Sequence, residues 1–119
     1  MQIAILTQRN ESLHAFATGL GAVQDWLDNA QTALELAKTS SWDLLVVDAA
    51  MPGLEYKSFI MKLLQTNAMI NTAVITDQPD SIFHQESEGL GVLCAIPSPP
   101  AQADGAAVAH KLKSLLGLS

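Results

Sequence analysis

Cysteine and basic residues are scarce in this sequence. Cys94 is the only cysteine, so an internal disulfide and a cysteine-based zinc cluster are excluded. Six Lys and Arg stand against twelve Asp and Glu, which gives a formal net charge of −6. Nucleic acids and anionic membranes are bound by clustered Lys and Arg, and this chain has no basic run, so we expect neither partner.

Long apolar runs are also missing. No segment approaches the roughly 20 apolar residues that cross a bilayer. Residues 1–6 lack the cationic start of a secretory signal. We therefore expect a cytoplasmic protein, in which Cys94 stays reduced as a small core residue of a strand.

Common enzyme motifs are absent as well. Gly19-Leu20-Gly21 follows a predicted helix, which is the wrong context for a nucleotide-binding loop, and no Gly-x-Ser-x-Gly elbow occurs. His14, His84 and His110 lie far apart, and no pair has the spacing of metal ligands on a helix. We expect no enzyme, no catalytic residue and no metal-binding residue.

The chain is instead rich in apolar residues. They make up 49% of 119 residues, while charged residues make up 15%. That balance excludes a disordered chain, and the length fits one domain over residues 1–119.

Short apolar runs alternate with stretches that have one apolar helical face. Residues 44–47 form the strongest strand signal, an unbroken apolar run typical of a central parallel strand. Residues 22–28 are ambiguous between a loop and a short edge strand. The remaining expected strands are 3–6, 72–76 and 92–96, and the expected helices are 10–20, 29–38, 55–65, 81–88 and 105–116. Such alternation predicts an α/β fold, a parallel sheet with helices on both faces.

Sites in sheets of this kind form where the strands end. Asp48 follows the predicted central strand, and Met51-Pro52 comes shortly after it. An apolar strand followed by Asp, two variable residues and Met-Pro resembles the phosphoacceptor segment of response-regulator receiver domains, the CheY-like family. The resemblance implies a flavodoxin-like three-layer sandwich with a five-stranded sheet in the order 2-1-3-4-5. It makes Asp48 the candidate phosphoacceptor and Thr76 the candidate switch residue.

The departures from the family pattern are informative. Receiver domains carry two adjacent acidic residues after the first strand, which help to bind Mg²⁺, and here those positions hold Thr7 and Gln8. By the same alignment, the family's Lys is Ile96 and its aromatic switch residue is Leu93. Phosphoryl transfer depends on positioning and on neutralising negative charge, so these losses predict poor phosphorylation. The resemblance also implies a cis peptide bond between Ile96 and Pro97.

Several alternatives stay open at this point. Asp48 is either a retained switch or a structural residue at the end of a strand, and Thr76 is either a switch or a strand former. Asp77 is a site neighbour that either repels a phosphoryl group, replaces a metal ligand beside Gln8, or caps a turn.

The leading hypothesis is a degenerate receiver domain in signal transduction that acts through protein contact. Its partner is a second copy or another protein, through the face of the fourth helix, fifth strand and fifth helix. On that face, Phe83 is either an exposed anchor or a core residue. No cofactor is expected, and Mg²⁺ is expected only if the site is functional. The alternatives are a phosphoaccepting switch at Asp48 fed by a histidine kinase and a flavodoxin-like module that binds a small neutral ligand.

Overall fold

The structure is a computed structural model that describes residues 1–118. Strands and helices alternate along the chain, and a short 3₁₀ helix, η1, precedes the first α-helix. The strands are β1 (Ile3–Leu6), β2 (Asp25–Leu27), β3 (Leu44–Asp48), β4 (Asn71–Ile75) and β5 (Val92–Ile96). The helical elements are η1 (Asn10–Leu13), α1 (His14–Leu20), α2 (Ala30–Ala37), α3 (Tyr56–Thr66), α4 (Asp80–Glu86) and α5 (Gln102–Leu116).

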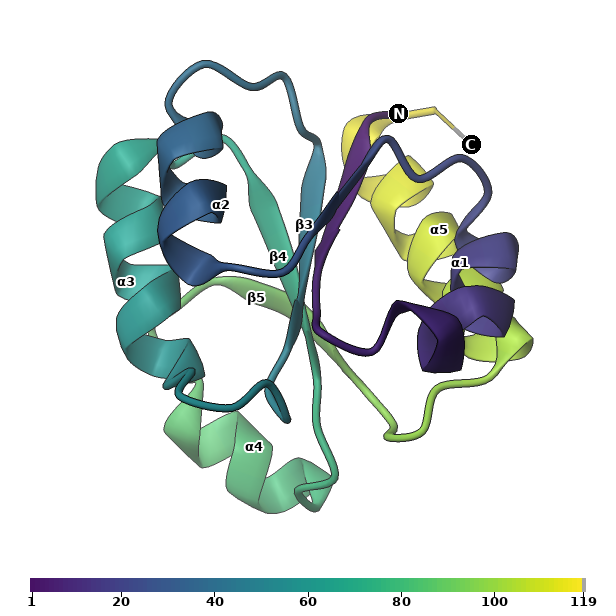
Figure 1. Ribbon diagram of the computed structural model, residues 1–119. Helices are drawn as coiled ribbons and strands as arrows, with labels where there is room; N and C mark the ends of the chain where they lie inside the picture. Colours follow the sequence, from purple (N-terminus) through teal and green to yellow (C-terminus); the bar gives the residue numbers. More distant parts are fainter. Residues whose placement is uncertain (119) are drawn as a thin grey trace.

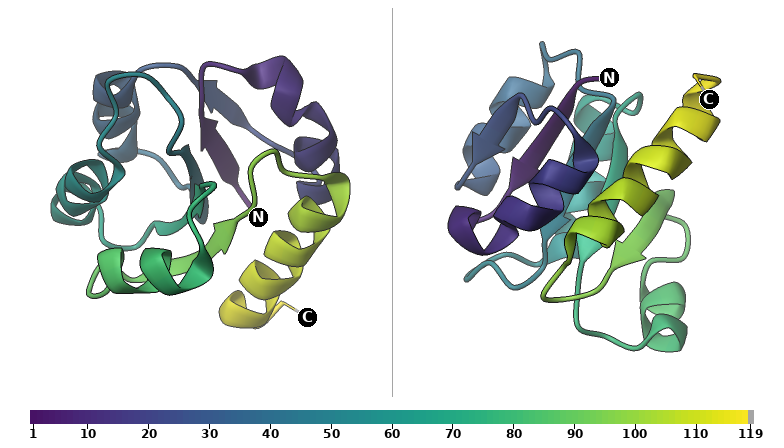
Figure 2. Two further views of the ribbon diagram at one scale, coloured as in Figure 1. Left: turned by 90° about the horizontal axis from the view of Figure 1, so that it is seen from below. Right: turned by 90° about the vertical axis from the view of Figure 1, so that its right-hand side faces the viewer.

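The strands form one parallel sheet in the order β2-β1-β3-β4-β5. Strand β3 is central and buried along its whole length, which confirms the prediction for residues 44–47. Helices α2, α3 and α4 lie on one side of the sheet, and α1 and α5 lie on the other (Figure 1; Figure 2). The fold is therefore the predicted flavodoxin-like sandwich.

Each face of the sheet has its own apolar core, because alternate side chains of a buried strand point to opposite faces. Leu45 and Val47 of β3 pack toward α2 and α3, whereas Leu44 and Val46 pack toward α1 and α5. The inward residues predicted for the first helix are all buried, namely Leu13 of η1 and Phe16, Ala17 and Leu20 of α1. By contrast, Leu115 and Leu116, expected on the apolar stripe of α5, are exposed.

Helices α1 and α5 approach each other at two glycines. A Cβ atom on Gly19 would lie 2.0 Å from the carbonyl oxygen of Gln102. A Cβ atom on Gly105 would lie 2.1 Å from the carbonyl oxygen of Phe16. The two backbones are therefore in contact, which holds α5 directly against α1 (Figure 2).

Two local expectations need correction. The last helix begins at Gln102 rather than near residue 105, because the Asp104 carboxylate accepts a hydrogen bond from the Ala101 amide at 2.7 Å. Within residues 1–118 the cis peptide bond is Ser98–Pro99, so the expectation of a cis bond at Ile96–Pro97 was wrong. Several X–Pro bonds occur in this segment, and their small cis–trans energy difference gives the sequence no means of choosing among them.

The weak signal at residues 22–28 marks a real edge strand. Strand β2 pairs with β1, and the Gln24 amide donates to the Ile3 carbonyl at 2.8 Å. Asp25 accepts a hydrogen bond from the indole nitrogen of Trp42 at 2.8 Å. Across residues 1–118, no helix combines the length and the apolar content that spanning a bilayer requires.

Candidate functional site at the carboxyl ends of the strands

Asp48 is the last residue of β3, and its side chain is 1% exposed. Its carboxylate accepts four hydrogen bonds. Oδ2 accepts from the Thr7 hydroxyl at 2.7 Å and from Arg9 Nε at 2.7 Å. Oδ1 accepts from a terminal nitrogen of Arg9 at 3.0 Å and from the Ala50 amide at 3.1 Å. Both oxygens are thus occupied, and the arginine contact is bidentate.

Arg9 lies just beyond the end of β1, next to Thr7 and Gln8. Its terminal nitrogen also donates to the Ser98 hydroxyl at 3.0 Å, so one guanidinium connects the loops that follow β1 and β5 to the last residue of β3. Its side chain is 32% exposed, which leaves one side of the ion pair open to solvent.

The pKa values of the two partners follow from this contact. Burial alone would raise the pKa of the Asp48 carboxyl. Hydrogen bonds from Arg9, Thr7 and Ala50, together with the arginine charge, outweigh burial and lower that pKa below its usual value. The hydrogen bond to Asp48 also raises the pKa of Arg9. Asp48 is therefore held as a carboxylate.

The positions that aligned with the family's acidic pair behave differently from one another. Thr7 is fully buried and bonds to Asp48. Gln8 is exposed, and its side-chain amide donates to the Asp28 carbonyl at 3.2 Å, away from Asp48.

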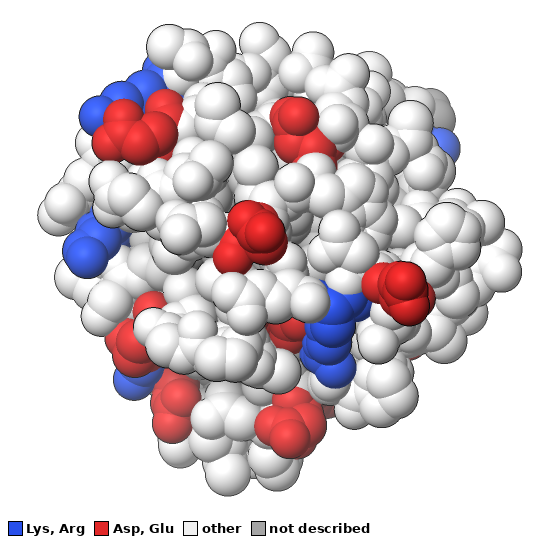
Figure 3. All heavy atoms as spheres, in the orientation of Figure 1, with Lys and Arg blue, Asp and Glu red and all other residues white. Residues whose placement is uncertain are grey.

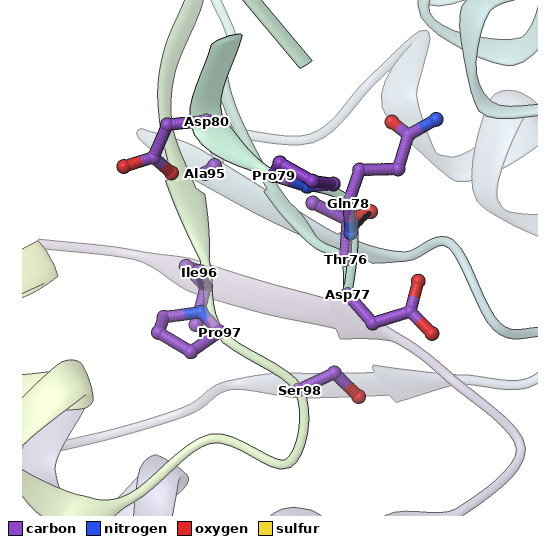
Figure 4. A pocket seen from close by; sticks show the side chains of 9 residues that line it. All are labelled: Thr76, Asp77, Gln78, Pro79, Asp80, Ala95, Ile96, Pro97 and Ser98. Atoms are coloured by element: carbon purple, nitrogen blue, oxygen red, sulfur yellow. Dashed lines mark hydrogen bonds between the residues drawn. The ribbon is translucent and has the colours of Figure 1, made fainter. Parts of the chain in front are cut away.

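Thr76 and Asp77 follow β4. Thr76 is buried, and its hydroxyl oxygen accepts from the Gln78 amide at 3.1 Å, which closes a turn. Asp77 is exposed and extends away from Ile96 and Pro97 (Figure 4).

The positions on β5 carry no polar group into the site. Ile96 is 1% exposed and packs into the core on the side of α1 and α5. Leu93 is half-buried and falls at a register shift, where Thr72 pairs with Val92 and Ala73 pairs with Cys94. Asp48 pairs with Ile75, and Ile75 pairs with Ile96, so Leu93 lies nearer the start of β5 and away from the level of Asp48.

This donor set does not fit Mg²⁺. The ion takes six oxygen ligands, usually including one or two carboxylates. The carboxylate of Asp48 is already bonded on both oxygens, and Thr7 and Gln8 replace acidic residues. The guanidinium of Arg9 adds a positive charge where a cation would bind. Among residues 1–118 no cluster of three or more His, Cys, Asp or Glu is suited to a metal ion.

Arg9 and Ser98 are the site residues that the sequence reasoning missed. One signal was available, because Arg9 is the only arginine in the chain and follows the first strand directly. The family pattern places a cation at the position of Ile96, whereas the fold brings one from the loop after β1.

A groove of about 550 Å³ borders the site between the loops after β4 and β5. Thr76 and Pro79 line one wall, and Ile96, Pro97 and Ser98 line the other (Figure 4). A second groove of about 300 Å³ lies between α4, β5 and α5. Phe83 lies beneath it at 4% exposure and stacks on Tyr56 with ring centroids 5.7 Å apart, so Phe83 is a core residue and not an exposed anchor.

Comparison with known proteins gives the fold. The chain is similar to the REC domain of AraT, a response regulator from Geobacillus stearothermophilus, with 20% identity, 98% of this chain and 95% of that chain covered, and a TM-score of 0.81. It is similar to a CheY-like receiver domain protein from Methanospirillum hungatei, with 16% identity, coverage of 99% and 98%, and a TM-score of 0.80. A putative CpaE2 pilus assembly protein from Sinorhizobium meliloti matches at 21% identity, coverage of 94% and 99%, and a TM-score of 0.70.

No protein-family model matches the chain, and no curated protein matches it. The structural matches establish that the chain has the fold of response-regulator receiver domains. Because the same fold occurs in a protein described as a pilus assembly protein, the fold does not decide what this chain does.

Proposed function

We propose that this chain is a degenerate receiver domain that acts in signal transduction through protein contact, without efficient Mg²⁺-dependent phosphorylation. It catalyses no reaction of its own, works in the cytoplasm and binds neither nucleic acid nor membrane. The observation that carries the proposal is the bidentate ion pair between Arg9 and Asp48.

The ion pair opposes phosphorylation in two ways. A carboxylate oxygen of Asp48 has to attack phosphorus, and here each oxygen is engaged by two donors. The proposed site also lacks the acidic metal ligands that would help neutralise developing charge. Losing one preorganised electrostatic group commonly costs about 3–4 kcal/mol in the transition state, or roughly 100- to 1000-fold in rate.

The structural neighbours support a role in signalling. Several are described as response regulators or their receiver domains, including one from Mycobacterium tuberculosis. Acidic groups outnumber basic ones on the face shown in Figure 3, where no basic patch gathers. A partner protein is therefore a better fit than a nucleic acid.

Acetyl phosphate labelling tests the phosphorylation claim. The protein is incubated with acetyl phosphate and Mg²⁺, and intact mass is followed over time. We expect no phosphoryl adduct on the wild type. An adduct that disappears in Asp48→Asn would instead establish Asp48 as a working phosphoacceptor.

The proposed contact face surrounds β5, and its proposed occupant is a second copy of the chain. Strand β5 is an edge strand without a charged residue, although charges commonly protect such edges. The groove beside it has Asp80 on the α4 side and exposed Lys111 on the α5 side. A two-fold axis that sets α4 of one copy against α5 of the other would bring Asp80 next to Lys111 of the second copy.

Light scattering after size-exclusion chromatography tests this face. We expect the mass to rise toward that of a dimer with increasing concentration, and Lys111→Glu to reduce the rise. Lys62→Glu, an exposed lysine on α3, is the matched control. A mass that stays monomeric at all concentrations would contradict a second copy as the occupant and favour a different protein.

A further inference from the structure

His84 lines the groove of about 300 Å³ between α4, β5 and α5, which forms part of the proposed contact face. Its side chain is exposed and lies in the last turn of α4. The other two histidines, His14 and His110, do not line this groove. Histidine is the side chain whose ordinary change of charge falls between about pH 5 and 8. His84 therefore gives the proposed face a group that gains charge in mild acid.

Three further titratable groups line the same groove, one from each element around it. Asp80 lies on α4, four residues before His84, and therefore one turn away on the same side of the helix. Lys111 comes from α5, and Cys94 comes from β5. Burial raises the pKa of the Cys94 thiol and outweighs the opposite effect of the Lys111 charge, so Cys94 stays neutral. The charged neighbours of His84 in the groove are thus one carboxylate and one ammonium group.

Two more carboxylates near the end of α4 lie outside the groove. Glu86 accepts a hydrogen bond from the side-chain amide of Gln78 at 3.2 Å. Its charge also helps raise the pKa of Tyr56 on α3, after the larger effect of burial, so Glu86 faces α3. Glu88 is exposed in the turn that follows the helix. Neither carboxylate is placed to compensate a charge on His84 within the groove.

The charges of the groove are balanced while His84 is neutral. Asp80 supplies a negative charge on the α4 side, and Lys111 supplies a positive charge on the α5 side. The two-fold contact proposed above sets α4 of one copy against α5 of the other, so this attraction occurs twice in a dimer. A proton on His84 adds a positive charge one turn from Asp80. The protonated ring then pairs with Asp80 of its own copy and repels the lysine of the second copy.

From this arrangement we infer that His84 makes the proposed contact face sensitive to pH, and that its protonation weakens the association of two copies. The inference rests on the proposed function, because it requires a second copy on this face. It does not depend on whether Asp48 is phosphorylated.

The direction of the effect separates His84 from the general effect of acid. The formal net charge is −6, and protonation of all three histidines adds three positive charges and brings it to −3. Acid thus lowers the overall repulsion between two copies, which by itself favours association. A dimer that becomes weaker in acid therefore indicates a local charge at the contact.

Sedimentation equilibrium at about pH 7.5 and about pH 5.5 measures the dissociation constant of the dimer on either side of the titration of histidine. Low salt is used, because salt screens exposed charges. We expect the wild type to associate about 2- to 30-fold more weakly at the lower pH, the range for two exposed ion pairs. Circular dichroism at both pH values checks that the fold is unchanged.

Three variants separate the charge of His84 from other effects of acid. His84→Gln cannot take up the proton and should not weaken in acid. His84→Lys carries the positive charge throughout and should associate weakly at both pH values. His14→Gln is the matched control, because His14 is an exposed histidine on α1, and this variant should respond to pH as the wild type does.

Two results would overturn this inference alone. One is a wild-type dimer that does not weaken in acid, and the other is a His84→Gln dimer that weakens as much as the wild type. A wild type that stays monomeric at every concentration and at both pH values would overturn it together with the second copy as the occupant of the face.

Discussion

Arg9 closes over Asp48 with two parallel hydrogen bonds, 2.7 Å from Nε to Oδ2 and 3.0 Å from a terminal nitrogen to Oδ1. The two residues are far apart in sequence and meet because β1 and β3 are adjacent parallel strands. The carboxylate at the end of the central strand is thus paired with a cation of the same chain. The contributions of this ion pair to stability and to chemistry can be tested separately.

The first prediction concerns stability. Arg9→Met leaves the Asp48 carboxylate with only Thr7 and the Ala50 amide, and breaking a buried ion pair from one side is costly. Because Arg9 is about a third exposed, water compensates in part, and we expect a loss of about 1–3 kcal/mol in the free energy of unfolding by urea. Lys38→Met is the control, since the exposed pair of Lys38 with Glu35 contributes at most about 1 kcal/mol. Equal losses in both variants would argue against a stabilising role of Arg9.

The second prediction concerns acid. The pKa of Asp48 is lowered in the folded protein, whereas the unfolded chain takes up this proton near its ordinary pKa of about 3.9. The stability from the ion pair is therefore present above about pH 4 and is lost as pH falls through the lowered pKa. Urea midpoints measured from about pH 6 down to about pH 2 should fall more steeply for the wild type than for Arg9→Met. Parallel curves would show that protonation of Asp48 does not cause the loss of stability in acid.

The third prediction concerns the contact of α1 with α5. Gly105→Ala gains helix propensity of up to about 1 kcal/mol, but its methyl group would meet the Phe16 carbonyl oxygen at 2.1 Å. The backbone carbonyl cannot rotate aside as a side chain can, and overpacking typically costs about 1–3 kcal/mol of stability. We therefore expect Gly105→Ala to lower the melting temperature. The matched change Ala107→Gly, at an exposed position of α5, should cost about 1 kcal/mol from propensity alone. A higher melting temperature for Gly105→Ala would mean that α1 and α5 can move apart without a loss of stability.

The fourth prediction distinguishes core from surface on α4. Phe83 is buried and stacked on Tyr56, so Phe83→Ala should lower the free energy of unfolding by about 3–5 kcal/mol. Its neighbour Ile82 is 44% exposed, so Ile82→Ala should cost less than about 1 kcal/mol. Chemical denaturation measures both. A small loss in Phe83→Ala would return this residue to the role of a surface anchor.

The order of the elements was predictable because it depends on local apolar patterns. The uninterrupted run before Asp48 marked the central strand, and the inward face of α1 followed from its spacing. The edge strand β2 gave a weak signal because it has only three residues, too few for an apolar pattern. It is held by backbone pairing with β1 and by the hydrogen bond from the Trp42 indole to Asp25.

The site was less predictable because its main contact is not local. The positions of Thr7, Asp48 and Thr76 followed from the strand ends. The partner of Asp48 depends on which way the loop after β1 turns. The family pattern places a cation at the position of Ile96 and gives no reason to expect one at Arg9. Where a site differs from the family pattern, the replacement contact comes from the fold and not from the aligned position.

Beryllofluoride titration in Mg²⁺ tests the central claim most directly, because this anion mimics an aspartyl phosphate and binds tightly only where the metal site works. Amide NMR shifts of Asp48, Ala50 and Thr76 report the outcome. The account predicts spectra that do not change at micromolar protein. Saturable shifts in the wild type that vanish in Asp48→Asn would show that Arg9 yields to a phosphoryl group and that Asp48 is a working switch.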